Sequence, residues 1–377
     1  MPIYKIPGKR DGYQKYRIVV NYTDSSGKKK TKEKYAYGKA AAENAERELL
    51  SKIKRGGKEP ASEILVTDLL KLYEEKRGSE IRETTLRKKR GIFKHHIEPF
   101  FKNITLQALT SEKISDWRDW LGSKDMKLGT KNNAIRELHA YLNFAVQIKL
   151  IPNNSMTIKQ FRDPYRVPDS ETIRYYTRDE FQKYIAEAKK WAEKRNDLQA
   201  WGIYTFFNLA YYTGMRKGEI NALRWSDIEN TSTIWVRRSI SQKIKGSRIT
   251  ETPPKNESSV RRLQMPTPLI TVLDEHMERQ MKDKKWNVDY RICGGPDVIP
   301  DTTLEKANQL FAETASIKKI TIHEFRHSHA SLLCNAGINI KEIARRLGHS
   351  DVNMTWKTYS HLYPAEEEKA IAILNTI

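Results

Sequence analysis

The segment TIHEFRHSHASLLCNAGINIKEIARRLGHSDVNMTWKTYSH, residues 321–361, carries an unusual group of polar side chains. His323 and Arg326 are one helical turn apart, His349 follows 23 residues later, and Tyr359 comes ten residues after that. Imidazole and guanidinium groups bind the oxygens of a phosphodiester, and a phenol can attack the phosphorus. The segment therefore predicts a site for phosphodiester chemistry on a mainly helical framework.

The charge of the chain indicates what kind of molecule it binds. Among 377 residues, 68 are Lys or Arg and 47 are Asp or Glu, which gives a net charge of +21. Such an excess favours a polyanionic partner, and nucleic acid is the commonest one. A basic membrane-surface protein is the alternative, but no basic amphipathic helix dominates and no apolar run could span a bilayer. We expect a DNA- or RNA-binding protein with no membrane contact.

Two further features predict a cytoplasmic protein. The first residues, MPIYKIPGKR, lack the apolar stretch of a secretory signal. The two cysteines, Cys293 and Cys334, are typical of reduced thiols rather than of a disulfide framework. A length of 377 residues leaves room for two or three domains, each with its own core.

Residues 1–58 are expected to form a small basic domain. They contain 16 Lys and Arg against 6 Asp and Glu, nearly half of the excess charge. The pattern predicts a short strand over 3–6, two strands around a turn at 24–27, and a helix over about 39–54. Strands of this charge could enter a DNA major groove, although a lysine-rich hairpin that only faces water is the alternative. The candidate contacts are Lys28, Lys29, Lys30 and Lys32.

Residues 63–165 are expected to form an all-α domain, after a Gly- and Pro-containing linker at 55–62. Apolar side chains recur at helical spacing in four stretches, and Thr110 is a predicted cap. Trp117 and Trp120 are interpreted as core residues rather than platforms for DNA bases. Basic side chains on these helices are expected to face outward and meet phosphates. The candidates are Arg87, Lys88, Lys89, Arg90 and Lys131.

Residues 175–377 read as an α+β domain, mainly helical with a small sheet. Strand-like runs around 232–264 separate two helical blocks, an arrangement that predicts one layered domain. The stretch YYTGMRKGEI puts Arg216 after a glycine and Glu219 one helical turn later. A glycine before a helix N-terminus favours anion binding, and Glu219 could hold the Arg216 fork in place. Lys255 lies in a predicted turn between two strands and could donate a proton if that hairpin covers a substrate.

A zinc site is the competing interpretation of the central segment. His323, Glu324 and His327 match H-E-x-x-H, in which two histidines bind Zn²⁺ and the glutamate acts as a base. Arg326 inside the motif argues against a cation there, and Glu342 is the best third ligand available. The other interpretation uses His323 and Arg326 together and leaves His327 and His329 to structural roles.

The ordered set T-G-x-R-x-x-E, a hairpin Lys, H-x-x-R, L-G-H and T-Y-S-H resembles the tyrosine recombinase, or phage integrase, family. The resemblance covers about 175–377. It extends more weakly to 63–165, similar to a core-type DNA-binding domain, and to 1–58, similar to the arm-type domain of integrases from phages and conjugative transposons. It implies a multidomain recombinase that needs no metal or cofactor.

The resemblance also implies roles for individual residues. Tyr359 attacks the scissile phosphate and forms a 3′-phosphotyrosyl link. Arg216, Arg326 and His349 stabilise the phosphorane charge, Lys255 protonates the leaving oxygen, and Glu219 orients the site. His323 either accepts the tyrosine proton or holds the phosphate, and both roles stay open.

The implied assembly is a homotetramer on double-stranded attachment-site DNA that exchanges strands through a Holliday junction. The free protein is expected to be a monomer or weak dimer in a bacterial host cell, aided by an excision factor or a DNA-bending protein. The tail at 364–377 could dock on a neighbouring protomer or pack on its own domain. A type IB topoisomerase and a non-catalytic DNA-binding regulator are the alternative functions.

Overall fold

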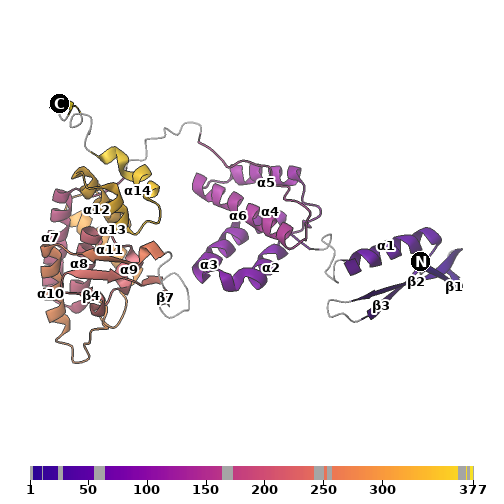
Figure 1. Ribbon diagram of the computed structural model, residues 1–377, viewed down its shortest axis with the longest axis horizontal. Coiled ribbons are helices and arrows are strands. Elements are labelled where there is room, and N and C mark those ends of the chain that lie inside the picture. Colours follow the sequence, from indigo (N-terminus) through magenta and orange to yellow (C-terminus); the bar gives the residue numbers. More distant parts are fainter. Residues whose placement is uncertain are drawn as a thin grey trace. The chain divides into compact units, whose positions relative to one another are not determined.

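The computed structural model describes residues 3–10, 12–23, 29–54, 64–163, 173–241, 250–252, 257–363, 371 and 374–376. The chain divides into two compact units, Met1–Arg166 and Val167–Ile377. Figure 1 shows the elements along the chain. Among the described residues, no helix has both the length and the apolar character needed to cross a membrane.

The N-terminal part is a three-stranded antiparallel sheet covered on one face by a helix. Its elements are β1 (Ile3–Arg10), β2 (Tyr13–Thr23), β3 (Lys29–Tyr37) and α1 (Lys39–Lys54), with sheet order β1-β2-β3. Alternate residues of β2, Ile18 and Val20, point toward Ala42 and Leu49 of α1 and form a small core. The predicted sheet and helix are confirmed. The turn at 24–27 and the linker at 55–62 lie outside the described residues.

The middle part is helical, as predicted. Its elements are α2 (Asp68–Arg77), α3 (Glu83–Ile92), the π-helical turn η2 (Phe93–Ile97), α4 (Glu98–Phe101), α5 (Ser111–Ser123) and α6 (Leu128–Gln147). The Thr110 hydroxyl accepts a hydrogen bond from the Lys113 amide and caps α5, as expected. Trp117 is fully buried, so its interpretation as a core residue is confirmed, whereas Trp120 is only partly buried against the same core. The Trp117 indole donates to the His96 carbonyl.

The C-terminal part is an α+β domain with two small antiparallel sheets. Its helices are α7 (Arg178–Arg195), α8 (Leu198–Thr213), α9 (Lys217–Ala222), α10 (Thr267–Gln280), α11 (Asp301–Thr314), α12 (Glu324–Asn335), α13 (Ile340–Leu347) and α14 (Val352–Tyr359). Its strands are β4 (Ile228–Glu229), β5 (Thr233–Val236), β6 (Ser239–Ser241), β7 (Thr250–Thr252) and β8 (Arg261–Gln264). The sheets have the orders β4-β5-β8 and β6-β7.

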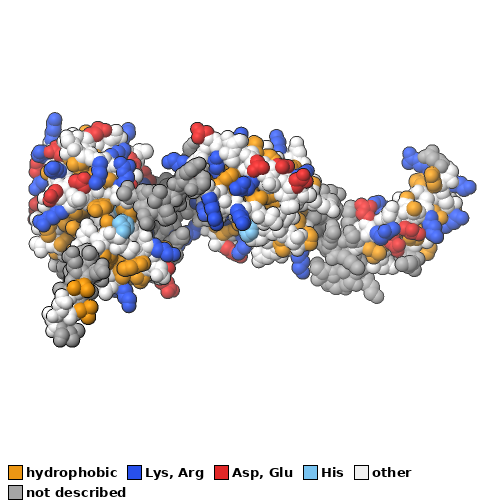
Figure 2. Space-filling view, turned by 90° about the horizontal axis from the view of Figure 1, so that it is seen from above, with side chains coloured by type: hydrophobic (Ala, Val, Ile, Leu, Met, Phe, Trp, Pro, Cys, Tyr) orange, Lys and Arg blue, Asp and Glu red, His pale blue; other side chains and the backbone are white. Residues whose placement is uncertain are grey.

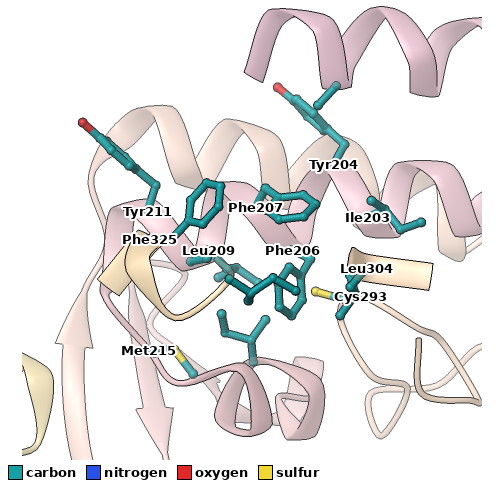
Figure 3. Packing of buried hydrophobic residues seen from close by; sticks show 14 of the residues in the cluster. Ile203, Tyr204, Phe206, Phe207, Leu209, Tyr211, Met215, Cys293, Leu304 and Phe325 are labelled. Atoms are coloured by element: carbon teal, nitrogen blue, oxygen red, sulfur yellow. The ribbon is translucent and has the colours of Figure 1, made fainter. Parts of the chain in front are cut away.

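Helix α8 is the centre of this domain because nearly all of its residues are buried. Figure 3 shows Phe206 and Phe207 of α8 packed among side chains from distant segments, including Cys293 and Phe325. The Phe207 and Phe325 ring centroids are 5.2 Å apart, which joins α8 to α12. This contact places the C-terminal end of α8 beside the segment that carries His323 and Arg326.

Candidate active site

Arg216 and Glu219 form the pair that the sequence predicted. Helix α8 is followed by Gly214, its C-cap, whose φ of 64° is left-handed, and Arg216 is the N-cap of α9. The Arg216 Nη1 donates to Glu219 Oε1 at 2.8 Å, and the Arg216 amide donates to Glu219 Oε2 at 3.0 Å. Glu219 is 3% exposed, whereas the Arg216 side chain remains partly accessible. The carboxylate thus fixes the guanidinium while one side of it faces outward.

Arg261 of β8 is a second arginine on the same carboxylate. Its Nη2 donates to Glu219 Oε2 at 2.9 Å, and its Nε donates to the Arg346 carbonyl at 2.6 Å. Burial raises the pKa of the Glu219 carboxyl, but the charges of Arg261 and Arg216 outweigh burial and hold that pKa below its usual value. Glu219 is therefore ionised at neutral pH and links α9 to β8.

Two carbonyl groups bring the predicted phosphate-binding side chains together. Arg216 Nη2 donates to the carbonyl of Gly348, the residue before His349, at 3.3 Å. Arg326 Nη1 donates to the carbonyl of Gly214, two residues before Arg216, at 2.8 Å. Arg216, Arg326 and His349 therefore surround one location, although they come from α9, α12 and the turn before α14.

Arg326 has a charge that the fold leaves partly unsatisfied. The side chain is 4% exposed, and within the described part of the chain its Nη2 has no hydrogen-bond partner. Burial, and next the charge of Arg216, lower the pKa of Arg326 to about 9. A buried guanidinium nitrogen without a partner is energetically unfavourable, and a bound anion would relieve that state.

The two histidines of this site differ in exposure. Burial, followed by the charges of Arg326 and Arg216, lowers the pKa of His349 to about 4, so its imidazole is neutral at neutral pH. Nδ1 of His349 lies 2.7 Å from the Thr355 hydroxyl. In the tautomer in which that hydroxyl donates to Nδ1, Nε2 carries the hydrogen and can donate it to an anion. His323 is exposed, yet partial desolvation and then Arg326 and Arg216 lower its pKa as well.

Tyr359, the predicted nucleophile, is the last residue of α14 and is 2% exposed. Its ring packs against apolar side chains of α12 and α13, including Ala330 and Leu347. Its hydroxyl lies 2.6 Å from Nδ1 of His327. Burial raises the pKa of the phenol well above its usual value. This contact was not predicted, because His327 was expected to have a structural role or, in the zinc interpretation, to bind a metal.

The side chains of the H-E-x-x-H motif make separate contacts. The Thr321 amide donates to Glu324, and His327 contacts Tyr359. The His323 and His327 rings are 5.3 Å apart, edge to face. In the described ranges, no group of three or more His, Cys, Asp or Glu side chains is arranged to hold a metal ion.

Comparison with known proteins identifies the domain that contains this site. Residues 174–366, just over half of the chain, match the phage integrase family. The chain belongs to the phage integrase family. Residues 65–121 match the N-terminal SAM-like domain of phage integrases, in agreement with the helical middle part. The C-terminal domain of this integrase is thus a tyrosine recombinase catalytic domain.

Relatives of this integrase cover most of its length. It is 27% identical to a XerC-like tyrosine recombinase of Caldanaerobacter subterraneus, over 98% of this chain and 97% of the relative. It is 27% identical to the ICEBs1 integrase of Bacillus subtilis, over 74% of each chain. The Tn1549 transposon integrase bound to circular intermediate DNA has a similar fold, with a TM-score of 0.64 and 18% identity, over 83% of this chain and 99% of that one. A lambda integrase tetramer bound to a Holliday junction has a TM-score of 0.52 and 18% identity, over 93% and 95%.

The candidate DNA contacts of the helical domain differ in orientation. The outward orientation predicted for Lys89 is wrong, because its side chain is 12% exposed and pairs with Glu137 at 2.6 Å. Arg90 pairs with Glu74 at 2.7 Å, and Lys131 donates to a backbone carbonyl at 2.6 Å. Three of the five residues that were predicted to meet DNA therefore bind groups within this domain.

Arg87 and Lys88 are exposed, and Lys32 is partly exposed on β3. On the face in Figure 2, Lys and Arg side chains are interspersed with acidic ones on the described parts. Some predicted residues lie outside what the structure describes, wholly or in their side chains: Lys28, Lys29, Lys30, Lys255 and most of the tail at 364–377.

Proposed function

We propose that this integrase cuts and rejoins duplex DNA at specific sites through a covalent bond between Tyr359 and a 3′ phosphate. The observation that carries this proposal is the unpartnered Nη2 of Arg326, buried beside Arg216 and the turn that holds His349. A phosphodiester supplies the negative oxygens that these donors lack. Chain segments more than 100 residues apart meet there, so the fold itself gathers these donors at one place.

The resemblance to the family and the contacts of the described residues together assign a role to each side chain. Arg216, Arg326 and neutral His349 bind the non-bridging oxygens and stabilise the charge that develops on them as the phosphorane forms. Glu219 is a positioning residue, because it holds the Arg216 fork and does not face the substrate. His323 either holds the phosphate from the exposed side or accepts the proton of Tyr359. Lys255 protonates the leaving 5′ oxygen, so the bond energy is kept in the tyrosyl ester and resealing follows.

The remaining domains deliver this site to DNA. Residues 1–58 bind arm-type sites through the basic sheet, residues 63–165 bind the core site, and residues 175–377 carry out the chemistry. A homotetramer on DNA exchanges strands through a Holliday junction, the kind of complex in which the lambda integrase tetramer was solved. The free protein is a monomer or weak dimer in the cytoplasm of a bacterial host, and an excision factor or DNA-bending protein sets the direction.

The test is covalent capture on a nicked duplex. The duplex carries the site that the protein selects from a random-sequence DNA pool, and the nick lets the short cleaved product diffuse away. We expect a denaturation-resistant protein–DNA adduct with the native protein and none with Tyr359→Phe, whose fold and DNA affinity should be unchanged.

Other outcomes would favour other functions. Sequence-selective binding without any adduct would leave only a DNA-binding regulator. Relaxation of plasmids that lack the selected site, without recombinants, would instead indicate a type IB topoisomerase.

A further inference from the structure

The nucleophile candidate has a base in direct contact. Tyr359 lies at the end of α14 and His327 in the first turns of α12, 32 positions earlier in the chain. The 2.6 Å between the phenol oxygen and Nδ1 is within the range needed for proton transfer. Among the described residues, His327 is the hydrogen-bond partner of this hydroxyl.

We propose that His327 is the catalytic residue that accepts the phenolic proton when Tyr359 attacks. This inference rests on the proposed function and deepens it, because it separates the two roles left open for His323. The His323 ring is exposed and lies 5.3 Å from the His327 ring, with no hydrogen bond to the phenol. His323 therefore contacts phosphate, while His327 takes the proton.

The step is balanced as a transesterification. The O–H bond of Tyr359 breaks and its proton goes to the Nδ1 lone pair of His327. The phenol oxygen forms a bond to phosphorus as the bond from phosphorus to the 5′ oxygen breaks, and that oxygen takes a proton from Lys255. On resealing, the 5′ hydroxyl attacks, its proton returns to Lys255, and imidazolium His327 returns its proton to the departing phenolate.

The surroundings of His327 favour the form that this step needs. Burial, and next the charge of His323, lower the pKa of His327; Glu324 opposes them with a smaller effect, and Arg326 adds the smallest lowering. Tyr359 faces the ring from α14. The imidazole is therefore neutral at neutral pH, and proton transfer to Nδ1 uses the tautomer that carries its hydrogen on Nε2. A buried phenol is a poor nucleophile until such a base removes its proton.

The experiment compares His327→Asn with His327→Ala in the full chain. Asparagine can place its side-chain oxygen near the position of Nδ1, so it keeps a hydrogen-bond acceptor for the phenol but cannot take a proton. Adduct formation on the nicked duplex is measured under single-turnover conditions. We expect both variants to be slower by roughly 10²–10⁴-fold at neutral pH. Their rates should rise with pH where the native rate is flat, and added imidazole should partly restore His327→Ala.

His323→Asn is the matched control on the same helix. It should lower the rate without producing the new dependence on pH or the response to imidazole. DNA affinity and melting temperature show whether each variant is folded. If His327→Ala unfolds the domain, the comparison between His327→Asn and the native protein remains as the test.

A native rate and pH profile for His327→Asn would reduce His327 to a positioning residue and overturn the proposal. An undiminished rate for His327→Ala would also overturn it. Failure of the proposed function is distinct, because then the native protein itself forms no Tyr359-dependent adduct.

Discussion

The carboxylate of Glu219 offers a quantitative test of how the site is held together. Glu219→Gln preserves the size of the side chain and removes its charge. The glutamate is 3% exposed and accepts hydrogen bonds from Arg216 and from Arg261, which is also 3% exposed. The substitution therefore leaves the Arg261 guanidinium buried without a counter-charge.

The expected magnitude follows from this burial. Removal of one partner from a buried ion pair costs about 3–5 kcal/mol. Domains of 150–250 residues lose about 2–4 °C of melting temperature per kcal/mol, so the catalytic domain should melt roughly 6–20 °C lower. The pKa of Glu219 is held below its usual value, so its contribution to stability is complete above that usual value and is lost as pH falls through the folded-state pKa. The difference between the two proteins should shrink in acid.

Differential scanning calorimetry of the full chain measures this change. Glu229→Gln is the matched control, because Glu229 also accepts two hydrogen bonds from one arginine, Arg262, but at an exposed position. Exposed ion pairs of this kind contribute little to the free energy of unfolding. Equal, small shifts of the melting temperature in the two variants would refute the reasoning, since burial would then not change how much an ion pair stabilises the fold.

Three further results are expected. Gly214→Ala should destabilise the domain more than Gly337→Ala. Both glycines have a left-handed φ, which costs an alanine about 1–2 kcal/mol. A Cβ at Gly214 would in addition lie 2.7 Å from His329, and this overlap adds about 1–3 kcal/mol. Equal changes in urea unfolding would contradict this. Arg326→Lys should slow adduct formation roughly 10²–10³-fold with little loss of DNA affinity, because lysine lacks the planar fork; a native single-turnover rate would disprove that role. DNA affinity should fall by about 10³–10⁵ between 50 and 200 mM salt if 6–10 phosphates are contacted, and a flat titration would exclude such a footprint.

The predictions from sequence succeeded where the determining pattern is local. Alternation along β2 and the composition of α1 were sufficient for the N-terminal sheet and helix. The Arg216–Glu219 pair could be expected because residues three apart on a helix face the same way. The π-helical turn at Phe93–Ile97 was not predicted, because a five-residue hydrogen-bond step leaves no clear mark in apolar spacing.

The contacts that were missed depend on long-range packing. Arg261 reaches Glu219 from a strand 42 positions later, and the only signal in the sequence was its place two residues before Leu263, on the same face of a predicted strand. No pattern in the sequence distinguished His327 from a structural histidine, because only the packing of α14 on α12 places its ring beside the Tyr359 hydroxyl. Lys89 turned inward because Tyr73 and Tyr141 form a surface for its ammonium group.

The shortage of carboxylates around the anion site has a consequence for handling the protein. Arg216 and Arg261 share Glu219, whereas Arg326 is buried with no acidic partner among the described residues. Any anion that accepts a hydrogen bond from Arg326 Nη2 binds the folded state and raises its stability by mass action. Sulfate or phosphate in a storage buffer will therefore act as a weak stabiliser and compete with DNA, so affinities measured in such buffers will understate the true values.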